Sequence, residues 1–413
     1  MERRENESYL QYAKRLTIAV EDNLISYNEY GDYLLGEQNT YSSENLRKAF
    51  YVISKMFKMI DTDIKYDDVE FAKEIEQLKF ELLKERKKLQ TVNLEYHQNA
   101  RAEGRFELFL ELIETAINNL RPIVIKPTVY KENVDTETTG VLFISDAHYG
   151  RDVQLNGLFG EVINSYDTKE FENRMWSLLS QVDNDSFEIS YDKLDIIDCG
   201  DNIEGILRLG DSLTSLKTGV IQSAMQYAEF MATWVIEAHN RLGVPVTYKL
   251  TGGNHDTLRL LGSKPCFQNE NIAKFICEHI RLRIENSKLQ SQLDTGDLPK
   301  IKVCEYNDVL YQNYYGINLV AYHGDTKNMK EDIEFFENFY QIDIDILVGG
   351  HLHRNSSETI GVGYMGDREL IRLPSICGND TFSKNIRRLS RAGATFMTFS
   401  KNGKGWGKPY YLN

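Results

Sequence analysis

The feature that most constrains this chain is Val246–Asp256, where an alternating apolar run stops abruptly at polar residues. The run predicts a buried strand that Gly252 and Gly253 bring to an end. The next three residues, Asn254, His255 and Asp256, are all polar. Proteins of the α/β class place their chemistry outside the carboxyl ends of their strands. This stretch therefore predicts a functional loop at a sheet edge.

Four further predicted strands end in the same way, and all of them follow residue 140. The five polar ends are Asp146-Ala-His148, Gly200-Asp201, Gly253-Asn254-His255-Asp256, His323-Gly324 and Gly350-His351-Leu352-His353. Between them lie helical patterns, so strands alternate with helices. This alternation predicts an α/β domain over residues 141–413.

The histidines are concentrated at these strand ends. Five of the eight histidines lie there, and the other three, His97, His239 and His279, fall in helical stretches where a surface or core-edge role suffices. Asp, His and Asn are the ligands that borderline and hard divalent cations take. The strand ends together predict a metal site.

The ordered set of five motifs resembles the calcineurin-like metallophosphoesterase superfamily, from about residue 141 to at least residue 353. The resemblance implies a four-layer α-β-β-α sandwich. It also implies two divalent cations per chain, with Mn²⁺ favoured by the mixed N/O ligand set and Fe, Zn or Mg as alternatives. Two such cations polarise a phosphoryl group and generate a metal-bound hydroxide that attacks in line.

The resemblance assigns a role to each matching position. Asp201 would bridge both cations. The remaining ligands would be Asp146, His148 and His353 for the first cation, and Asn254, His323 and His351 for the second.

His255 is adjacent to a ligand but is itself spare, so it would protonate the leaving oxygen or stabilise its charge. Glu204 is its expected partner, and within hydrogen-bonding reach it would raise the pKa of His255. Glu204 departs from the superfamily, because protein phosphatases carry Asp at this offset and double-strand-break-repair nucleases often carry His or Asp. Gly205 stands where the phosphatases carry an Arg. This difference argues against a phosphoprotein as the substrate.

The motif flanks also resemble the proofreading small subunit of archaeal replicative DNA polymerase. Arg259, Arg151 and Arg354 flank the motifs and could bind phosphate oxygens, although plain surface roles explain them equally well. We expect a nuclease that cleaves DNA. The alternatives are a phosphatase or small-nucleotide phosphodiesterase and, less favoured, a non-catalytic scaffold with this fold.

The residues before the α/β domain are predicted to be helical. Residues 1–65 give helix, turn and a second helix with a basic stripe, the outline of a helix-turn-helix unit; a small helical bundle is the alternative. Residues 66–120 approximate a heptad seam, typical of a coiled-coil-like arm and consistent with a homodimer. Residues 121–140 carry two prolines and an acidic Thr-rich stretch, and predict a linker.

Composition bounds the compartment more than the chemistry. The net charge is −14, so any attraction for nucleic acid must come from a local groove or from bound cations. Five scattered cysteines without a C-x-x-C pair favour reduced thiols. No apolar run has membrane-spanning length, and the first residues lack the apolar core of a signal peptide. We therefore expect a cytoplasmic protein with no membrane contact.

Overall fold

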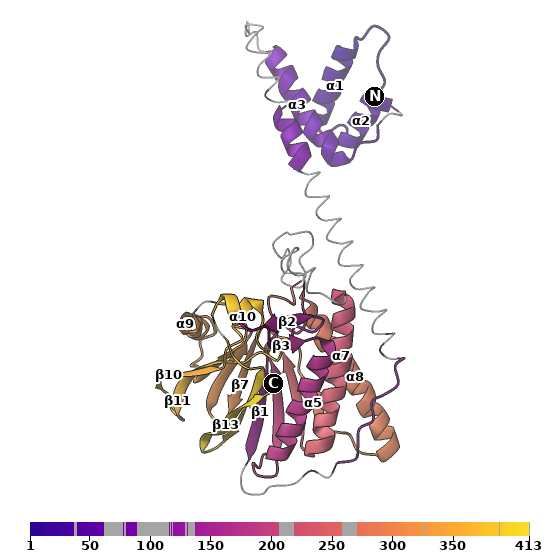
Figure 1. Ribbon diagram of the computed structural model, residues 1–413. Coiled ribbons are helices and arrows are strands. Elements are labelled where there is room, and N and C mark those ends of the chain that lie inside the picture. The colour runs from indigo at the N-terminus through magenta and orange to yellow at the C-terminus, as the bar shows by residue number, and fades with distance from the viewer. Residues whose placement is uncertain are drawn as a thin grey trace. The chain divides into compact units, whose positions relative to one another are not determined.

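The computed structural model describes residues 1–36, 39–61, 77, 80–88, 115, 117, 119–128, 130, 137–205, 219–257, 271–326, 328–387 and 389–412. The chain divides into two compact units, Met1–Glu103 and Gly104–Asn413 (Figure 1). Most of the predicted arm lies outside the described residues. Each unit is taken below by itself.

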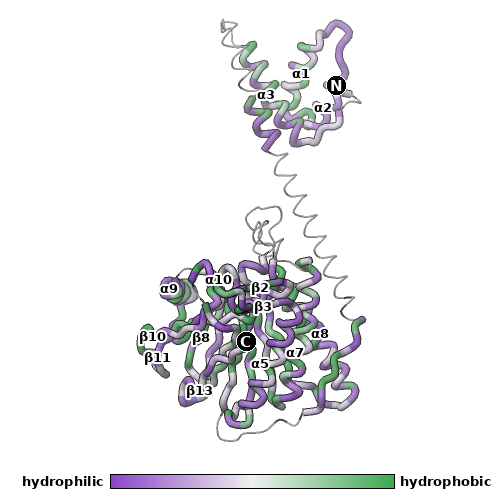
Figure 2. Tube along the Cα trace, viewed as in Figure 1, coloured by the Kyte–Doolittle hydropathy of each residue, from purple (hydrophilic) through white to green (hydrophobic). Residues whose placement is uncertain are grey.

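The first unit contains three helices, α1 (Tyr9–Glu21), α2 (Tyr27–Leu35) and α3 (Ser43–Asp61). The first two begin with capping boxes, in which Ser8 pairs with Gln11 and Ser26 pairs with Glu29. Figure 2 shows hydrophobic and hydrophilic residues alternating along α1 and α3. The hydrophobic faces meet in a small core of Tyr12, Leu16, Val20, Tyr30 and Phe50.

The second unit is built on a six-stranded sheet with the order β13-β12-β1-β4-β5-β6. Its strands are β1 (Thr138–Ile144), β4 (Lys193–Asp198), β5 (Val246–Leu250), β6 (Ile301–Val303), β12 (Gly393–Ser400) and β13 (Gly403–Tyr411). Strands β1, β4, β5 and β6 pair in parallel, and β12 and β13 extend the sheet antiparallel to them. Three helices pack on one face of this sheet: α5 (Thr168–Asp185), α7 (Val220–Leu242) and α8 (Ile272–Thr295).

A five-stranded sheet with the order β10-β11-β9-β8-β7 packs against the first. Its strands are β7 (Val309–Tyr314), β8 (Ile317–Tyr322), β9 (Ile346–Gly349), β10 (Ser356–Val362) and β11 (Asp367–Arg372). Helix α9 (Met329–Tyr340) covers its outer face with Met329, Ile333 and Phe336. A short helix, α10 (Thr381–Asn385), follows β11.

The period of two along β1 shows how the layers form. Leu142 and Ile144 enter the core shared with α5, α7 and α8, whereas Val141 and Phe143 enter the core between the two sheets. Both faces of β1 are therefore buried, which explains its continuous apolar sequence. The predicted α-β-β-α sandwich, preceded by helices, is confirmed.

One detail differs from the expectation. A hairpin of β2 (Val153–Asn156) and β3 (Val162–Tyr166) follows the first motif, in a stretch for which we expected no strand.

Part of the predicted linker lies against the α/β unit. The Ile123 amide donates to Ser287 Oγ at 2.9 Å, and the Lys126 amide donates to Asn240 Oδ1 at 2.9 Å. These bonds fix this segment along α7 and α8. In the described part of the chain, no helix is long and apolar enough to cross a membrane.

Candidate metal centre

The five polar motifs come together because their strands end at one edge of the sandwich. Strands β1, β4 and β5 run in parallel in one sheet, and β8 and β9 run in parallel in the other. Backbone hydrogen bonds then join the loops. The Asp146 amide donates to the Gly200 carbonyl at 2.9 Å, and the Gly350 amide donates to the His323 carbonyl at 2.7 Å.

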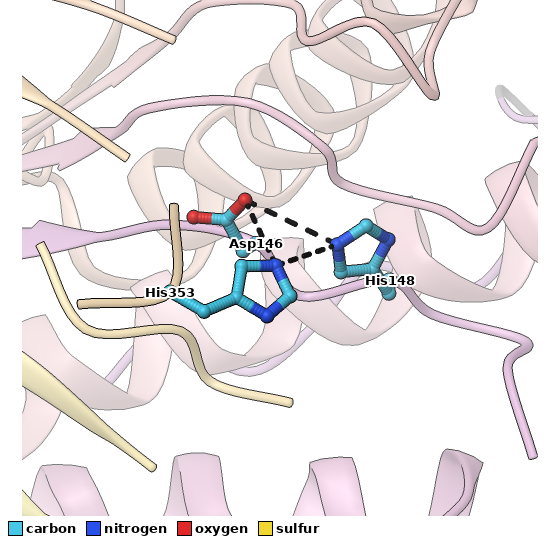
Figure 3. A group of neighbouring side chains, drawn as sticks. All are labelled: Asp146, His148 and His353. Atoms are coloured by element: carbon cyan, nitrogen blue, oxygen red, sulfur yellow. Dashed lines mark hydrogen bonds and ion pairs between the residues drawn. The ribbon is translucent and has the colours of Figure 1, made fainter. Parts of the chain in front are cut away.

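Asp146, His148 and His353 form the first group of donors, which we call group one (Figure 3). His148 Nε2 lies 3.2 Å from His353 Nε2, and Asp146 Oδ1 lies 3.4 Å from His353 Nε2 and 4.0 Å from His148 Nε2. All three side chains are buried. Three donor atoms from two loops therefore face one small volume.

Asn254, His323 and His351 form the second group, group two. His323 Nε2 lies 3.0 Å from Asn254 Oδ1 and 3.2 Å from His351 Nδ1. The Asn254 amide thus contributes its oxygen, as the sequence predicts for a ligand.

Asp201 lies between the two groups. Its Oδ2 is 3.8 Å from His148 Nε2 in group one and 3.2 Å from His323 Nε2 in group two. Its Oδ1 accepts a hydrogen bond from the His255 amide at 2.8 Å. The Asp201 carboxylate is therefore placed where it could ligate two cations, one in each group.

The donor set fits divalent cations, as His323 shows most clearly. Its Nδ1 lies 2.9 Å from the Cys199 carbonyl oxygen, which can only accept, so Nδ1 carries the hydrogen. In the neutral ring Nε2 then has a bare lone pair, and it faces the oxygens of Asp201 and Asn254. Acceptors that converge on one point need a cation or a proton between them.

The pKa values of these residues lead to the same conclusion. Burial opposes a charge on His323, but the Asp201 carboxylate outweighs burial and raises the pKa of His323 to about 10. Burial and the neighbouring His323 lower the pKa of His351 to about 4. Burial also opposes ionisation of Asp201, yet the surrounding histidines hold its pKa well below its usual value. The Asp201 carboxylate therefore attracts positive charge to this point, which either a proton on His323 or a cation can supply.

The backbone at the ligand positions is unusual. Among the described residues, nine other than glycine have a positive φ between 43° and 65°. Five of them are candidate ligands: Asp146, His148, Asp201, His351 and His353. Such residues persist where the surrounding structure forces them, and they cluster at functional sites. Gly350 allows one of these turns, since a Cβ there would lie 1.9 Å from Ser145 Oγ.

Glu204 contacts two histidines rather than one. Its Oε2 lies 3.0 Å from His148 Nδ1 and 3.5 Å from His255 Nδ1. The expected rise in the pKa of His255 is wrong: burial lowers the pKa of His255 despite the nearby Asp201 and Glu204 carboxylates. Glu204 is thus closer to a metal-ligand candidate than to the candidate acid.

The three arginines have different surroundings. Arg151 is largely buried, and its Nη1 lies 2.7 Å from Asp380 Oδ2. Arg354 is exposed. Arg259 lies outside the described residues. Of the two described arginines, Arg151 lies behind the donor groups, where it already has a carboxylate partner.

Sequence reasoning missed several residues that hold the loops. Asp380 is fully buried, and Asp256 accepts hydrogen bonds from the amides of Gly253 and Asn202 at 2.8 and 3.0 Å. Ser375 donates to the Asp146 carbonyl at 2.9 Å. Asp256 belongs to the motif Gly253-Asn254-His255-Asp256, so the sequence offered a signal for it. Asp380 and Ser375 belong to no recognisable pattern.

Comparisons with known proteins match both parts of the chain. The family described as the YonJ coiled-coil domain matches residues 78–120. The SPbeta prophage-derived uncharacterized protein YonJ of Bacillus subtilis (strain 168) is 26% identical over 336 residues, which cover 80% of this chain and 78% of that protein.

Similar solved structures include a phosphatase and a metallophosphoesterase. A dimetal phosphatase from Danio rerio is 9% identical, with a TM-score of 0.31, and covers 67% of this chain and 99% of that one. A metallophosphoesterase from Sphaerobacter thermophilus is 13% identical, with a TM-score of 0.28, and covers 66% and 89% respectively. With TM-scores of this size, the fold and the site rest on the strand order and side-chain geometry described above.

Proposed function

We propose that this protein is a metal-dependent phosphodiesterase that hydrolyses DNA. The observation that carries the proposal is the meeting of seven predicted ligands from five strand ends in two groups around Asp201. These side chains would hold two divalent cations, which when bound supply polarisation of the phosphoryl group and activation of water. Manganese is the first cation to test, because the donors mix imidazole with carboxylate and amide oxygens.

The side chains themselves orient the reaction. Asp146 is fixed by the His351 amide at 2.9 Å and by the Ser145 hydroxyl at 2.6 Å, so it cannot rotate away. His255 lies beside group one, with its ring centroid 4.7 Å from that of His148. From there it could donate a hydrogen bond to the leaving oxygen.

A DNA substrate is favoured over a small diester by the first unit. Helix α3 exposes Arg47, Tyr51, Lys55 and Lys58 along one stripe, as the sequence predicts. Basic side chains with an interleaved aromatic ring are typical of nucleic-acid contacts. Because the chain as a whole is acidic, this stripe and the bound cations would supply the local attraction for phosphate.

The test compares two substrates with Mn²⁺: labelled single- and double-stranded DNA, and bis(p-nitrophenyl) phosphate. We expect cleavage of both substrate types. The variant Arg47→Gln/Lys55→Gln should cleave DNA several-fold more slowly and the small diester at the wild-type rate. Lys193→Gln/Lys401→Gln is the matched control. It removes the same charge at the strand ends that lie away from the donor groups.

Two outcomes would change the conclusion. Cleavage of the small diester with intact DNA would make the protein a small-molecule phosphodiesterase. Failure on both substrates, with two cations bound, would leave the phosphoesterase fold as a scaffold.

A further inference from the structure

The two histidines of group one each have a carboxylate on the side away from the donor cluster. Glu204 Oε2 lies 3.0 Å from His148 Nδ1. Asp380 Oδ1 lies 3.9 Å from His353 Nδ1, an ion-pair contact rather than a hydrogen bond. In both rings Nδ1 faces a carboxylate while Nε2 faces the other donors.

A single guanidinium connects these carboxylates. Arg151 Nη1 lies 2.7 Å from Asp380 Oδ2 and 3.8 Å from Glu204 Oε2. The side chains of Glu204 and Asp380 are 4% and 0% exposed, and that of Arg151 is 14% exposed. Removing these charges from water is costly. The two carboxylates therefore need the Arg151 guanidinium beside them if they are to stay ionised.

The three charged residues come from separate loops. Arg151 follows β1, Glu204 follows β4, and Asp380 precedes α10. Their meeting therefore depends on the tertiary fold, and Arg151 is the partner that the two carboxylates share.

We propose that Arg151, Glu204 and Asp380 act as one positioning unit, the Arg151 brace, for the two histidines of group one. The Glu204 carboxylate beside Nδ1 of His148 favours the tautomer with its hydrogen there, and the Asp380 charge acts on His353 in the same direction from a longer distance, so each Nε2 is left to bind a cation. The brace therefore sets the cation affinity of group one. This inference rests on the metal binding in the proposed function, and it reassigns Arg151 from substrate phosphate to the support of the ligands.

Group two has a different support, so the brace predicts an effect on one cation only. Behind His323 stands the neutral Cys199 carbonyl, 2.9 Å from Nδ1. Neutralising the brace should leave that contact unchanged.

The experiment is a calorimetric titration of the metal-stripped full-length chain with Mn²⁺. We expect two binding events in the wild type. In Asp380→Asn and in Arg151→Gln, one event should weaken about 10- to 100-fold while the other keeps its affinity. The double variant should bind Mn²⁺ only slightly less tightly than the single variant with the lower affinity, because the two side chains act as a unit. Asp367→Asn, the same charge change at an exposed position in β11, is the control and should match the wild type.

Folding is checked by circular dichroism on each variant. If Asp380→Asn does not fold, Glu204→Gln, which keeps the side-chain size, decides by the same titration. Unchanged binding in the folded variants would overturn the brace, and so would equal weakening of both events. A wild type that binds no Mn²⁺ would instead overturn the proposed function.

Discussion

Group one and group two use the same kinds of donor, yet the surroundings behind them differ. Behind group one, burial opposes ionisation of Asp380, but His353 and Arg151 outweigh it and lower the pKa of Asp380 to about 2. Behind group two, Asp198 precedes Cys199, and burial raises the pKa of Asp198 to about 7. One group is supported by buried fixed charge, and the other by neutral dipoles.

The difference shows what decides the charge of a buried carboxyl. Asp198 accepts hydrogen bonds from the hydroxyls of Tyr227 and Tyr248 at 2.6 and 2.8 Å, and these neutral donors do not offset its loss of water. Asp380 faces a guanidinium, which does. Burial alone therefore does not determine the ionisation of a carboxyl; the charge of its partner does.

The largest effect should come from the residue that the two groups share. Asp201→Asn takes the charge from both, so we expect loss of both cations and a fall in turnover of at least about 10⁴-fold. Elemental analysis beside the diesterase assay measures both. Retention of two cations with near-normal turnover would show that Asp201 does not link the groups.

A matched pair separates the groups. His353→Ala should lose the cation of group one, and His351→Ala that of group two, each with a drop in turnover of about 10³-fold or more because one of two stabilising charges is missing. If fixed charge makes group one the tighter, His351→Ala will hold its remaining cation more firmly in Mn²⁺ titration. The reverse order of affinities would contradict the comparison.

His255 lies between the two groups, since it follows Asn254 of group two in the chain but packs beside His148 of group one. His255→Asn should keep both cations and lower turnover on DNA by about 10²-fold, the lower end for a general acid, because burial keeps most of the imidazole neutral. The loss should be smaller on a nitrophenyl ester, whose leaving group needs less protonation. Equal losses would make His255 an electrostatic or positioning group, and loss of a cation would make it a ligand.

The smallest effect concerns stability alone. Because the pKa of Asp198 is higher in the folded than in the unfolded state, its protonated form contributes stability that is complete below about pH 4 and declines as pH rises through 7. Asp198→Asn cannot ionise, so it should be nearly as stable as wild type at about pH 4 and below, and more stable by up to about 4 kcal/mol at pH 8. Urea unfolding across this range measures the difference. Parallel pH profiles would show that Asp198 is not a source of the pH dependence.

The fold was predictable because periodicity reports burial directly. The alternation in β1 places Leu142 and Phe143 in different cores, as a period of two requires. The hairpin β2–β3 escaped prediction because its strands are short. Val153 and Leu155 alternate with polar residues over only four residues in β2, and Val162 of β3 is 56% exposed.

The donor side chains were predictable as a set because parallel strands carry their carboxyl ends to one edge. Their support was not. Arg151 and Asp380 lie more than two hundred residues apart, and nothing local distinguishes Asp380 from a surface turn residue. The fall in the pKa of His255 likewise depends on how deeply the fold buries it, which the order of residues does not state.

The left-handed turns at the donor positions bear on how this chain could drift over generations. Each such residue costs roughly 1 kcal/mol, so the five together cost roughly as much as the whole stability of a marginal domain. Asn or Gly at any of these positions would relax the backbone and weaken or remove a ligand at the same time. Selection for stability alone would move Asp146, His148, Asp201, His351 and His353 toward those residues. A chain with Asp and His at all five bears a folding cost for which the proposed ligation would account.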